Sequence, residues 1–487
     1  MKVFNSLYRQ EEEFIPQGDE VKMYVCGINP YSDSHLGHAL CYIVFDVVRR
    51  YLEFRGYKVK HVENVTDIED NIIATANRLG IPVKELTDKY TERYFEDMAA
   101  LNILPAHIYP KATEEIPKII EIVGGLIDKG FAYPSKGNVY FRVSKDPYYG
   151  KLSNRSLDSM EAGVRIEPED GKEHPMDFTL WKAAKPEEPS WESPWGEGRP
   201  GWHIECSAMS LRYLGETIDI HGGGQDLVFP HHENEIAQSE AFTGKRPFVK
   251  YWLHNGMVQL GEEKMSKSLG NLITIREALE KHSADAIRIF ALSSHYRSPL
   301  TYTEETLEAA EKGADRLRQV IVTEDGGEKG EGQIDIKSYR DRFIDSMDDD
   351  FGTPQALSSL FDLARDINRL SDEGFNVEPA KLELTELAGV LGLTLKPLET
   401  PELDTSPFEE YLSQLNRKMQ EEKIPPLDIT ASGPLSFDFI MGVFISSRES
   451  LRRSKHFHLA DEIRNKLAEL GITLEDNPQG TVWRYKR

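Results

Sequence analysis

The sequence predicts an α/β protein in which a doubly wound sheet is followed by a helical region. Residues 21–27 have the pattern of a short buried strand, and residues 39–55 have the apolar periodicity of a helix. A second strand is expected at 58–65, so strands and helices alternate as in parallel, nucleotide-binding sheets. From Thr303 onward, apolar residues recur at spacings of three and four, which indicates a bundle of helices.

The length of the chain indicates several domains, because 487 residues exceed what one hydrophobic core usually organises. Residues 108–199 combine helical patterns, a strand pattern at 137–143 and a stretch rich in Pro and Trp, so we expect an insertion there. The sheet is expected to resume at 217–220 and to enter a turn at Gly222–Gly224. A helix is then expected to begin at Pro230, because Pro is favoured at the first helical position.

The composition is that of an ordinary globular protein, with 39% hydrophobic and 29% charged residues. The N-terminal stretch has no apolar signal core, and no stretch of the chain approaches the roughly 18 apolar residues of a membrane span. We therefore expect a cytoplasmic protein that does not bind membranes. The three cysteines are too few and too scattered for a disulfide framework, which fits a reducing compartment.

Charge is unevenly distributed along the chain. The net charge of −24 argues, at first sight, against a nucleic-acid partner. From Phe439 to Arg487, however, nine Lys and Arg residues outnumber six Asp and Glu residues, which leaves a local charge of +3. This segment ends in Trp483 and Tyr485, whose rings could stack on unpaired bases. The segment is compatible with RNA binding, although a basic tail is more often a solvated surface.

A short block with two histidines, His35-Leu-Gly-His38, lies between the end of the first expected strand and the start of the first expected helix. Open α/β sheets bind nucleotides at this place, because the crevice lies at the carboxyl ends of the strands and the helix N-terminus favours phosphate. Gly37 allows a ligand to approach the backbone closely. Alone, such a block is more often two surface histidines that cap a helix, and a pair that binds zinc is a second alternative.

A second block, Lys264-Met-Ser-Lys-Ser268, lies in a polar stretch between Gly261 and Asn271, where we expect a mobile loop. Two lysines three residues apart, with two serines, suit a clamp on the negative charge that develops on a phosphoryl group and its leaving group. Taken alone, such a run is more often a solvated loop. Paired with the first block, it favours chemistry on ATP.

Four scattered residues could form a metal site. His231 and Glu235 are four residues apart on a predicted helix and share a face, and Cys26 and Cys206 each lie beside an element of the sheet domain. Two thiolates, an imidazole and a carboxylate make a tetrahedral zinc set. Cysteines are also common as small buried hydrophobic residues, and the spacing alone does not decide between these alternatives.

Two neighbours of this set are expected to take no part in it. Cys41 lies inside the apolar helix and is expected to be a core residue. His232 is about 100° around the helix from His231, so we expect it to point elsewhere.

The two blocks together resemble the signature of class I aminoacyl-tRNA synthetases, and the chain resembles the cysteinyl-tRNA synthetase family nearly from end to end. The resemblance runs from residue 3 to residue 483 and is densest at 64–67 (NVTD), 175–178 (PMDF), 198–207 (GRPGWHIECS) and 221–224 (HGGG). Runs this long and this ordered are highly specific. They imply a Rossmann-like catalytic domain with an inserted domain, followed by a helical bundle and a small C-terminal anticodon-binding domain.

On this basis we expect the following segments along the chain. They are the first half of the catalytic domain (1–107), the inserted connective domain (108–199), the second half of the catalytic domain (200–250), a stem-contact region with the lysine loop (251–302), a tRNA-binding helical bundle (303–393), a linker (394–435) and the anticodon-binding domain (436–487).

The resemblance also implies a reaction in two steps. L-cysteine and ATP form cysteinyl-adenylate and pyrophosphate, and the cysteinyl group then passes to the terminal ribose of cysteine tRNA. The implied catalytic residues, which stabilise phosphate charge, are His35, His38, Lys264 and Lys267, and the further implied ATP-binding residues are Gly223, Asp226, Ser266 and Ser268. The implied amino-acid contacts are Thr66, Trp202 and His221, and the implied anticodon contacts are Asp476 and Trp483. We expect Mg²⁺ with ATP, and a monomer because the family is usually monomeric.

All four candidate metal ligands match zinc ligands of the family, so the resemblance implies one Zn²⁺ per chain, bound by Cys26, Cys206, His231 and Glu235. A thiolate is a good zinc ligand, whereas a hydroxyl binds far more weakly. Zinc in the amino-acid pocket would therefore select cysteine over serine without an editing site.

The chain departs from the family pattern beside the expected pocket. Residues 29–32 are Asn-Pro-Tyr-Ser where relatives usually have Thr-Val-Tyr-Asp, and Leu40 replaces a frequent Arg. Two other functions stay open: a paralogous ATP-dependent ligase that joins cysteine to a small-molecule amine, and a non-catalytic RNA-binding relative. The first would be expected to lack the C-terminal module. The second would have little reason to keep both blocks and all four metal-ligand residues.

Overall fold

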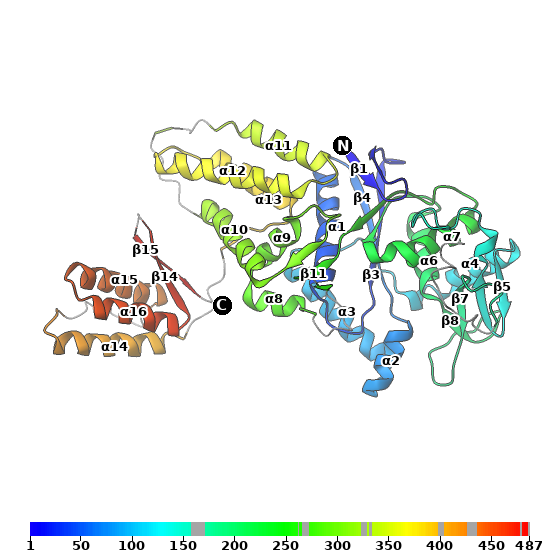
Figure 1. Ribbon diagram of the computed structural model, residues 1–487, viewed down its shortest axis with the longest axis horizontal. Helices are drawn as coiled ribbons and strands as arrows, with labels where there is room; N and C mark the ends of the chain where they lie inside the picture. The colour runs from blue at the N-terminus through cyan, green and yellow to red at the C-terminus, as the bar shows by residue number, and fades with distance from the viewer. Residues whose placement is uncertain are drawn as a thin grey trace. The chain divides into compact units, whose positions relative to one another are not determined.

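The computed structural model describes residues 1–156, 171–261, 263–264, 272–322, 329–330, 334–397, 404–425, 436–477 and 480–485. The chain divides into two compact units, Met1–Lys396 and Pro397–Arg487 (Figure 1). Within the described residues, no helix combines the length and the apolar character that crossing a bilayer requires.

A four-stranded parallel sheet lies at the centre of the first unit. In the order β10-β9-β3-β4, its strands are β10 (Val249–Asn255), β9 (Ile218–Gly224), β3 (Glu20–Ile28) and β4 (Lys58–Val65). Strands β3 and β4 confirm the two strands expected in the first part of the chain. The strand order reverses between β3 and β9, and open α/β sheets bind their ligands at such a switch point.

Helix α1 (Leu36–Phe54) follows β3 and runs beside the sheet (Figure 1). It begins before the expected start at residue 39, because His35 acts as its N-cap. The Nδ1 atom of His35 accepts a hydrogen bond from the backbone N–H of Gly37 at 3.1 Å. The histidine block therefore forms the first turn of the helix and does not precede it.

The insertion follows α2 (Asp70–Leu79) and α3 (Val83–Ala100), and it contains α4 (Ile116–Asp128) and a four-stranded antiparallel sheet. In the order β5-β6-β7-β8, the strands of this sheet are β5 (Ala132–Ser135), β6 (Asn138–Phe141), β7 (Phe178–Ala183) and β8 (Gly198–Pro200). Strand β6 confirms the strand pattern noted at 137–143. Helix α6 (Trp202–Leu214) then leads the chain back to the central sheet.

The glycine run Gly222–Gly224 lies inside β9 and not in the turn that we expected. A Cβ atom at Gly222 would come within 2.2 Å of the ring of Phe45 on α1. The absence of a side chain thus lets α1 pack closely on the strand. The run of glycines marks the place where α1 packs closely on β9. In the sequence alone, such a run looks the same as the glycines of a turn.

After β9 the chain passes through the 3₁₀ turn η3 (Gln225–Leu227) and the π-helical segment η4 (Val228–His232) before α7 (Glu233–Thr243). The backbone of Phe229 is extended, with φ of −141° and ψ of 130°, and it separates two helical turns. The helical backbone that leads into α7 therefore begins at Pro230, as the sequence predicts. The regular helix begins three residues later, at Glu233.

A small sheet follows the central one, in the order β12-β11-β13. Its strands are β11 (Val258–Leu260), β12 (Glu263–Lys264) and β13 (Leu300–Tyr302), and α8 (Ile275–Lys281) and α9 (Ala284–Leu292) lie between β12 and β13 in the chain. The N-terminal hairpin consists of β1 (Lys2–Asn5) and β2 (Gln10–Glu13).

The helical bundle expected after Thr303 is confirmed, and it consists of α10 (Glu304–Val322), α11 (Ile336–Asp348), α12 (Thr353–Asp372) and α13 (Glu378–Val390). A buried arginine connects the bundle to the sheet domain. Arg288 on α9 donates to Asp46 of α1 at 2.6 Å and to the carbonyl oxygen of Leu391, which follows α13, at 2.9 Å. The bundle and the sheet domain therefore share one continuous core.

The second unit contains α14 (Ser406–Glu421), α15 (Phe437–Arg453), α16 (Phe457–Glu469) and a hairpin of β14 (Ile472–Asn477) and β15 (Gly480–Tyr485). Helix α14 lies within the 394–435 segment that we expected to be a linker. Its apolar residues, among them Phe408 and Leu415, are buried in one core with Ile440 and Phe444 of α15. Much of the expected linker therefore belongs to the C-terminal unit.

Candidate active site

A cavity of about 320 Å³ lies at the carboxyl ends of β3, β9 and β10, at the switch point of the sheet. Residues of α1 and α6 complete its wall. The lining includes Cys26, His35, His38, Trp202, Asp226 and Asn255. All of these except Asn255 are site residues that the sequence analysis singled out.

The two histidines of the first block stack at the start of α1. Their ring centroids are 3.8 Å apart, and the ring planes differ by 16°. The Nδ1 atom of His35 accepts from Gly37, and the Nδ1 atom of His38 accepts from the backbone N–H of His35 at 3.2 Å. In the neutral rings each Nε2 then carries the proton and can donate to a ligand. Together with the helix N-terminus, this arrangement of donors suits a phosphate group at this end of the cavity.

The second block belongs only in part to the described residues. Lys264 lies in β12, where its backbone pairs with Gln259 of β11. Ser266, Lys267 and Ser268 lie outside the described residues.

The segment that follows the second block is hydrogen-bonded to the first block. Thr274 forms a β-bridge with His35, and the N–H of Leu36 donates to the carbonyl oxygen of Ile273 at 3.0 Å. The N–H of Ile275 donates to the carbonyl oxygen of Ser34 at 2.9 Å. These bonds bring the downstream end of the lysine loop to the helix start that carries the histidines.

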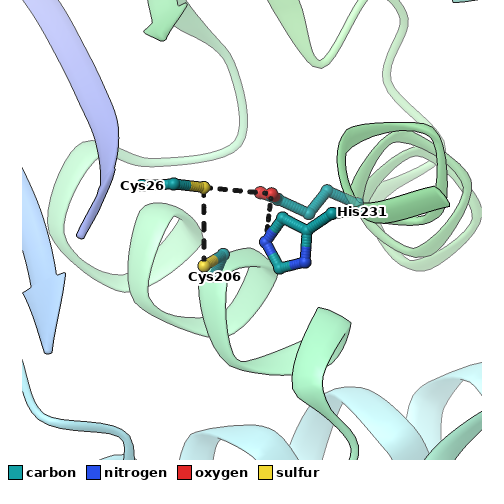
Figure 2. A group of neighbouring side chains, drawn as sticks. Cys26, Cys206 and His231 are labelled. Carbon is teal, nitrogen blue, oxygen red and sulfur yellow. Dashed lines mark hydrogen bonds and ion pairs between the residues drawn. The ribbon is translucent and has the colours of Figure 1, made fainter. Parts of the chain in front are cut away.

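Cys26, Cys206, His231 and Glu235 converge in a buried cluster beside the cavity. Figure 2 shows the two cysteines and His231 turned toward one another from β3, α6 and η4. The two Sγ atoms are 3.9 Å apart, and one Glu235 oxygen lies 3.7 Å from Cys26 Sγ and 3.1 Å from His231 Nε2. One ligand atom of each residue lies within 4.8 Å of the others. This donor set fits a tetrahedral zinc ion.

The electrostatics of the cluster favour a cation. The Cys26 thiol donates toward Cys206 and lowers the pKa of the Cys206 thiol. Burial alone would lower the pKa of His231, but the neighbouring Cys206 and Glu235 raise it to about 10. The cluster thus gathers negative charge that a protonated imidazole balances. A metal ion would take over this role and displace the proton.

Asn64, at the end of β4, holds the end of β3 that carries Cys26 in place. Its Oδ1 accepts hydrogen bonds from the N–H of Gly27 at 2.9 Å and from the hydroxyl of Tyr24 at 3.1 Å. A Cβ atom at Gly27 would lie 1.6 Å from the carbonyl oxygen of Asn64, so no other residue fits beside Cys26 without separating the strands.

His232 does not point away from the cluster, as the helical spacing led us to expect. Its Nε2 lies 3.3 Å from Cys26 Sγ, and its Nδ1 lies 2.8 Å from His254 Nε2. The expectation fails because His231 and His232 belong to a π-helical segment that follows a kink, and not to the regular helix α7. As a result, Cys26, His221, His232 and Glu235 form a second set with metal-binding geometry, which shares two residues with the first.

The three residues expected to contact the amino acid lie at different depths. Trp202 lines the cavity, and its ring centroid is 4.4 Å from that of His231. His221 is fully buried, with Nε2 2.9 Å from a Glu235 oxygen. Thr66 is also buried, and its hydroxyl accepts from Asn64 Nδ2 at 3.1 Å. Trp202 can touch a substrate directly, whereas His221 contacts the metal cluster.

The residues expected to bind the ribose and phosphates of ATP after β9 differ in environment. Asp226, in η3, is exposed and lines the cavity. Gly223 lies within β9, where an added Cβ atom would come within 2.9 Å of the His232 ring. The glycine is therefore also required for packing of the histidine.

Two cavity residues did not emerge as site residues from the sequence. Cys41, which we expected in the core, is half-buried and lines the cavity. Its spacing of three from His38 could have indicated this, because such residues share a helix face. Asn255 carries a weaker signal, as a polar residue at the end of an apolar strand pattern.

In the second unit, Trp483 lies on β15 and is half-buried. Its ring packs edge-on against Phe437, with centroids 5.3 Å apart. Asp476 lies on the neighbouring strand β14, where its backbone pairs with Thr481. The side chain of Asp476 lies outside the described residues.

Known proteins and protein families match this chain over most of its length. The profile of the family described as tRNA synthetases class I (C) catalytic domain matches residues 13–312, and that of the DALR domain matches residues 342–396. The chain is 56% identical to the cysteine–tRNA ligase of Dehalococcoides mccartyi over all of both chains. It is 48% identical to that of Thermococcus onnurineus over 99% of each.

Solved structures agree at the level of the fold. The structure of the methionyl-tRNA synthetase of Mycobacterium tuberculosis, in complex with methionyl-adenylate, superposes on this chain with a TM-score of 0.56 and 16% sequence identity. The match covers 78% of this chain and 88% of the methionyl-tRNA synthetase chain. The expected class I catalytic fold with a helical domain after it is confirmed. By the family profile and by its full-length relatives, the chain belongs to the cysteine–tRNA ligase family of class I tRNA synthetases.

Proposed function

We propose that this protein activates L-cysteine with ATP and joins it to cysteine tRNA. The observation that carries the proposal is the Cys26, Cys206, His231 and Glu235 cluster, which lies beside the cavity that the two signature histidines line. A thiol-selecting metal site and a phosphate-binding helix start are thus within reach of one small substrate. Full-length relatives that carry the name cysteine–tRNA ligase support the same function.

In the first step, the cysteine carboxylate attacks the α-phosphate of ATP and pyrophosphate leaves. His35 and His38 donate to phosphate oxygens through their Nε2 atoms, aided by the N-terminus of α1. Lys264 and Lys267 neutralise the charge that develops on the leaving group, and Ser266 and Ser268 add hydroxyl donors. Asp226 accepts from the ribose hydroxyls, Gly223 leaves room for the His232 ring beside the strand, and Mg²⁺ accompanies ATP.

The amino acid is selected by the metal cluster. Cys26, Cys206, His231 and Glu235 would hold one zinc ion, because two thiolates and an imidazole are ligands that zinc prefers. When bound, zinc supplies a position that accepts a thiolate far more readily than a hydroxyl. Trp202 closes one side of the pocket, and His221 orients Glu235. Thr66 positions Asn64, whose amide oxygen lies 3.6 Å from Cys206 Sγ.

In the second step, the cysteinyl group passes from the adenylate to the terminal ribose of the tRNA. The C-terminal unit would read the anticodon, with Asp476 and Trp483 among its contacts. We further propose that the protein acts as a monomer in the cytoplasm. The alternative, a ligase that joins cysteine to a small amine, is disfavoured because cysteine–tRNA ligases match this chain over its full length.

The proposal is tested by cysteine-dependent exchange of labelled pyrophosphate into ATP, measured for each of the amino acids with and without a zinc chelator. We expect exchange with cysteine only, its loss on metal removal, and its recovery with zinc. Charging of cysteine tRNA by the same preparation tests the second step. Exchange with serine in place of cysteine, or no exchange with any amino acid, would contradict the proposal.

A further inference from the structure

We propose that Arg276 is a positioning residue for the lysine loop, because it fixes the downstream end of this loop to helix α3. The inference rests on the proposed function, since it presupposes that the lysines of the second block act on the phosphates of ATP. It assigns a role to a residue that lies outside both blocks.

The guanidinium of Arg276 joins the first turn of α8 to α3. Its Nη2 donates to a carboxylate oxygen of Glu96 at 2.5 Å and to the carbonyl oxygen of Arg93 at 3.3 Å. Its Nε lies 2.9 Å from a carboxylate oxygen of Asp97, whose side chain is 3% exposed. An exposed ion pair, such as the one with Glu96, contributes little by itself. The contact with Asp97 compensates a charge that water does not reach, so this contact resists displacement.

Helix α3 is a rigid support for these contacts. Its Tyr94 is 2% exposed and donates its hydroxyl to the buried carboxylate of Glu63 on β4. The ring of Tyr94 packs edge-on against that of Tyr42 on α1, with centroids 5.3 Å apart. Arg276 is therefore attached to a helix that packs on α1, which begins with the first block.

The same face of α3 also holds the segment before the first block. Arg93 forms an ion pair with Asp33, which lies two residues before this block. Arg93, Glu96 and Asp97 are three and four residues apart, so they share one face of the helix. This face thus contacts the chain on both sides of the reacting groups, at Asp33 before the first block and at Arg276 after the second.

The two ends of the lysine loop are both attached to the fold. On the upstream side, the backbone of Lys264 pairs with Gln259 in the small sheet. On the downstream side, Thr274, the N-cap of α8, forms a bridge with His35. The bridge fixes one point of this segment. The contacts of Arg276, two residues later, fix the direction in which α8 leaves that point.

Fixed ends are important because the lysines act when negative charge moves onto the leaving pyrophosphate. A clamp whose ends are held loses less conformational freedom when it closes on this charge. Release of one end should lower the rate of adenylate formation, since a misplacement of about 1 Å is sufficient to reduce a rate by about 100-fold. Cysteine is selected at the metal cluster, so its binding should not depend on this attachment.

The test measures kcat and the KM for cysteine in pyrophosphate exchange, with the full chain and bound zinc. Arg276→Gln should lower kcat by about 10- to 100-fold and leave the KM for cysteine within about twofold of wild type. Asp97→Asn removes the charge of the partner, keeps its shape and leaves no buried charge, so it should reproduce this selective loss. Arg276→Lys keeps the positive charge and should recover part of the rate.

A double-mutant cycle with Lys267→Ala separates positioning from a loss of stability. If Arg276 acts through the lysine loop, Arg276→Gln should lower kcat by less than about threefold when Lys267 is already alanine. A role in stability alone gives the same factor in both backgrounds. The matched control is Lys281→Gln, on the same helix, because Lys281 pairs with Glu304 of α10 and not with α3. It should keep the wild-type kcat.

Three results would overturn the inference alone, provided that wild type shows normal exchange. They are an unchanged kcat in both Arg276→Gln and Asp97→Asn, equal factors for Arg276→Gln in the two backgrounds of the cycle, and a KM for cysteine that rises as much as kcat falls. Absence of exchange in wild type would overturn the proposed function, and this inference with it.

Discussion

Two overlapping sets of side chains have metal-binding geometry, and substitution of two adjacent histidines distinguishes them. Cys26 and Glu235 belong to both sets, and His231 and His232 each belong to one. We expect the set with His231 to hold the ion, because it has two thiolates and its imidazole touches the ring of Trp202 on the cavity wall. His232 instead uses its Nδ1 to contact His254 and lies deeper in the core.

The expected effects follow from these positions. Structural zinc sites bind with about 10–16 kcal/mol, so one ligand of four contributes about 2.5–4 kcal/mol. His231→Gln should therefore weaken zinc binding by about 100- to 1000-fold. His232→Gln removes a contact to the Cys26 sulfur at 3.3 Å and one to His254 at 2.8 Å, and it should weaken zinc binding by about 10- to 100-fold, as loss of outer contacts of metal sites usually does.

Zinc content after dialysis against a chelator of known affinity measures these differences. Cobalt substitution adds an independent readout, because thiolate-to-metal absorption reports the number of sulfur ligands. Cys206→Ser should reduce this absorption to that of a single thiolate. Unchanged absorption in Cys206→Ser, together with a larger loss of zinc in His232→Gln than in His231→Gln, would refute the reasoning and assign the ion to the other set. Thermal unfolding of each variant serves as the control for folding.

Three further predictions concern the rest of the chain. A chain that ends at Lys396 should keep the rate of cysteine-dependent exchange within about twofold of the full chain, because the first unit has a core of its own. Its rate of tRNA charging should fall by at least about 100-fold. Equal losses of exchange and charging would contradict this prediction. Burial raises the pKa of Glu63 from 4.5 to about 8, so ionisation of this carboxyl opposes folding as the pH rises. Urea unfolding should show wild type losing about 4 kcal/mol between pH 5 and 9, whereas Glu63→Gln should not lose this stability. Gly27→Ala should lower the free energy of unfolding by at least about 1–3 kcal/mol and reduce the amount of bound zinc. At Gly124 an added Cβ atom meets nothing within 4 Å, so Gly124→Ala should leave the free energy of unfolding unchanged or raise it by about 0.5–1 kcal/mol, in the same urea and zinc-content measurements.

The elements that could be predicted from the sequence are those with a strong local pattern. Strand β3, strand β4 and helix α1 carry runs of apolar residues with the period of their own secondary structure. The start of α1 was misplaced, because a histidine is an unusual N-cap and its role depends on a bond to Gly37. The C-terminal helix α14 was missed because the composition around it is rich in proline and acidic residues.

The errors near the site have a common cause. The glycines of β9 allow α1 to approach, and this requirement comes from Phe45, about 180 residues earlier in the chain. His232 turns toward Cys26 because the chain kinks at Phe229 before α7, and such a kink has no local period. Asn255 has an ordinary strand-end sequence, and only its unpartnered oxygen at the cavity distinguishes it.

By itself, the sequence determined the chemistry of this protein: two blocks suited to phosphate, four side chains suited to zinc, and the strand and helix that carry the first block. Residue type and short-range spacing are sufficient for this, because they decide charge, ligand preference and local periodicity. Only the tertiary structure decided which residues share the cavity and which histidine faces which sulfur. These depend on distances between segments that are remote in the chain, and packing of the whole fold determines such distances.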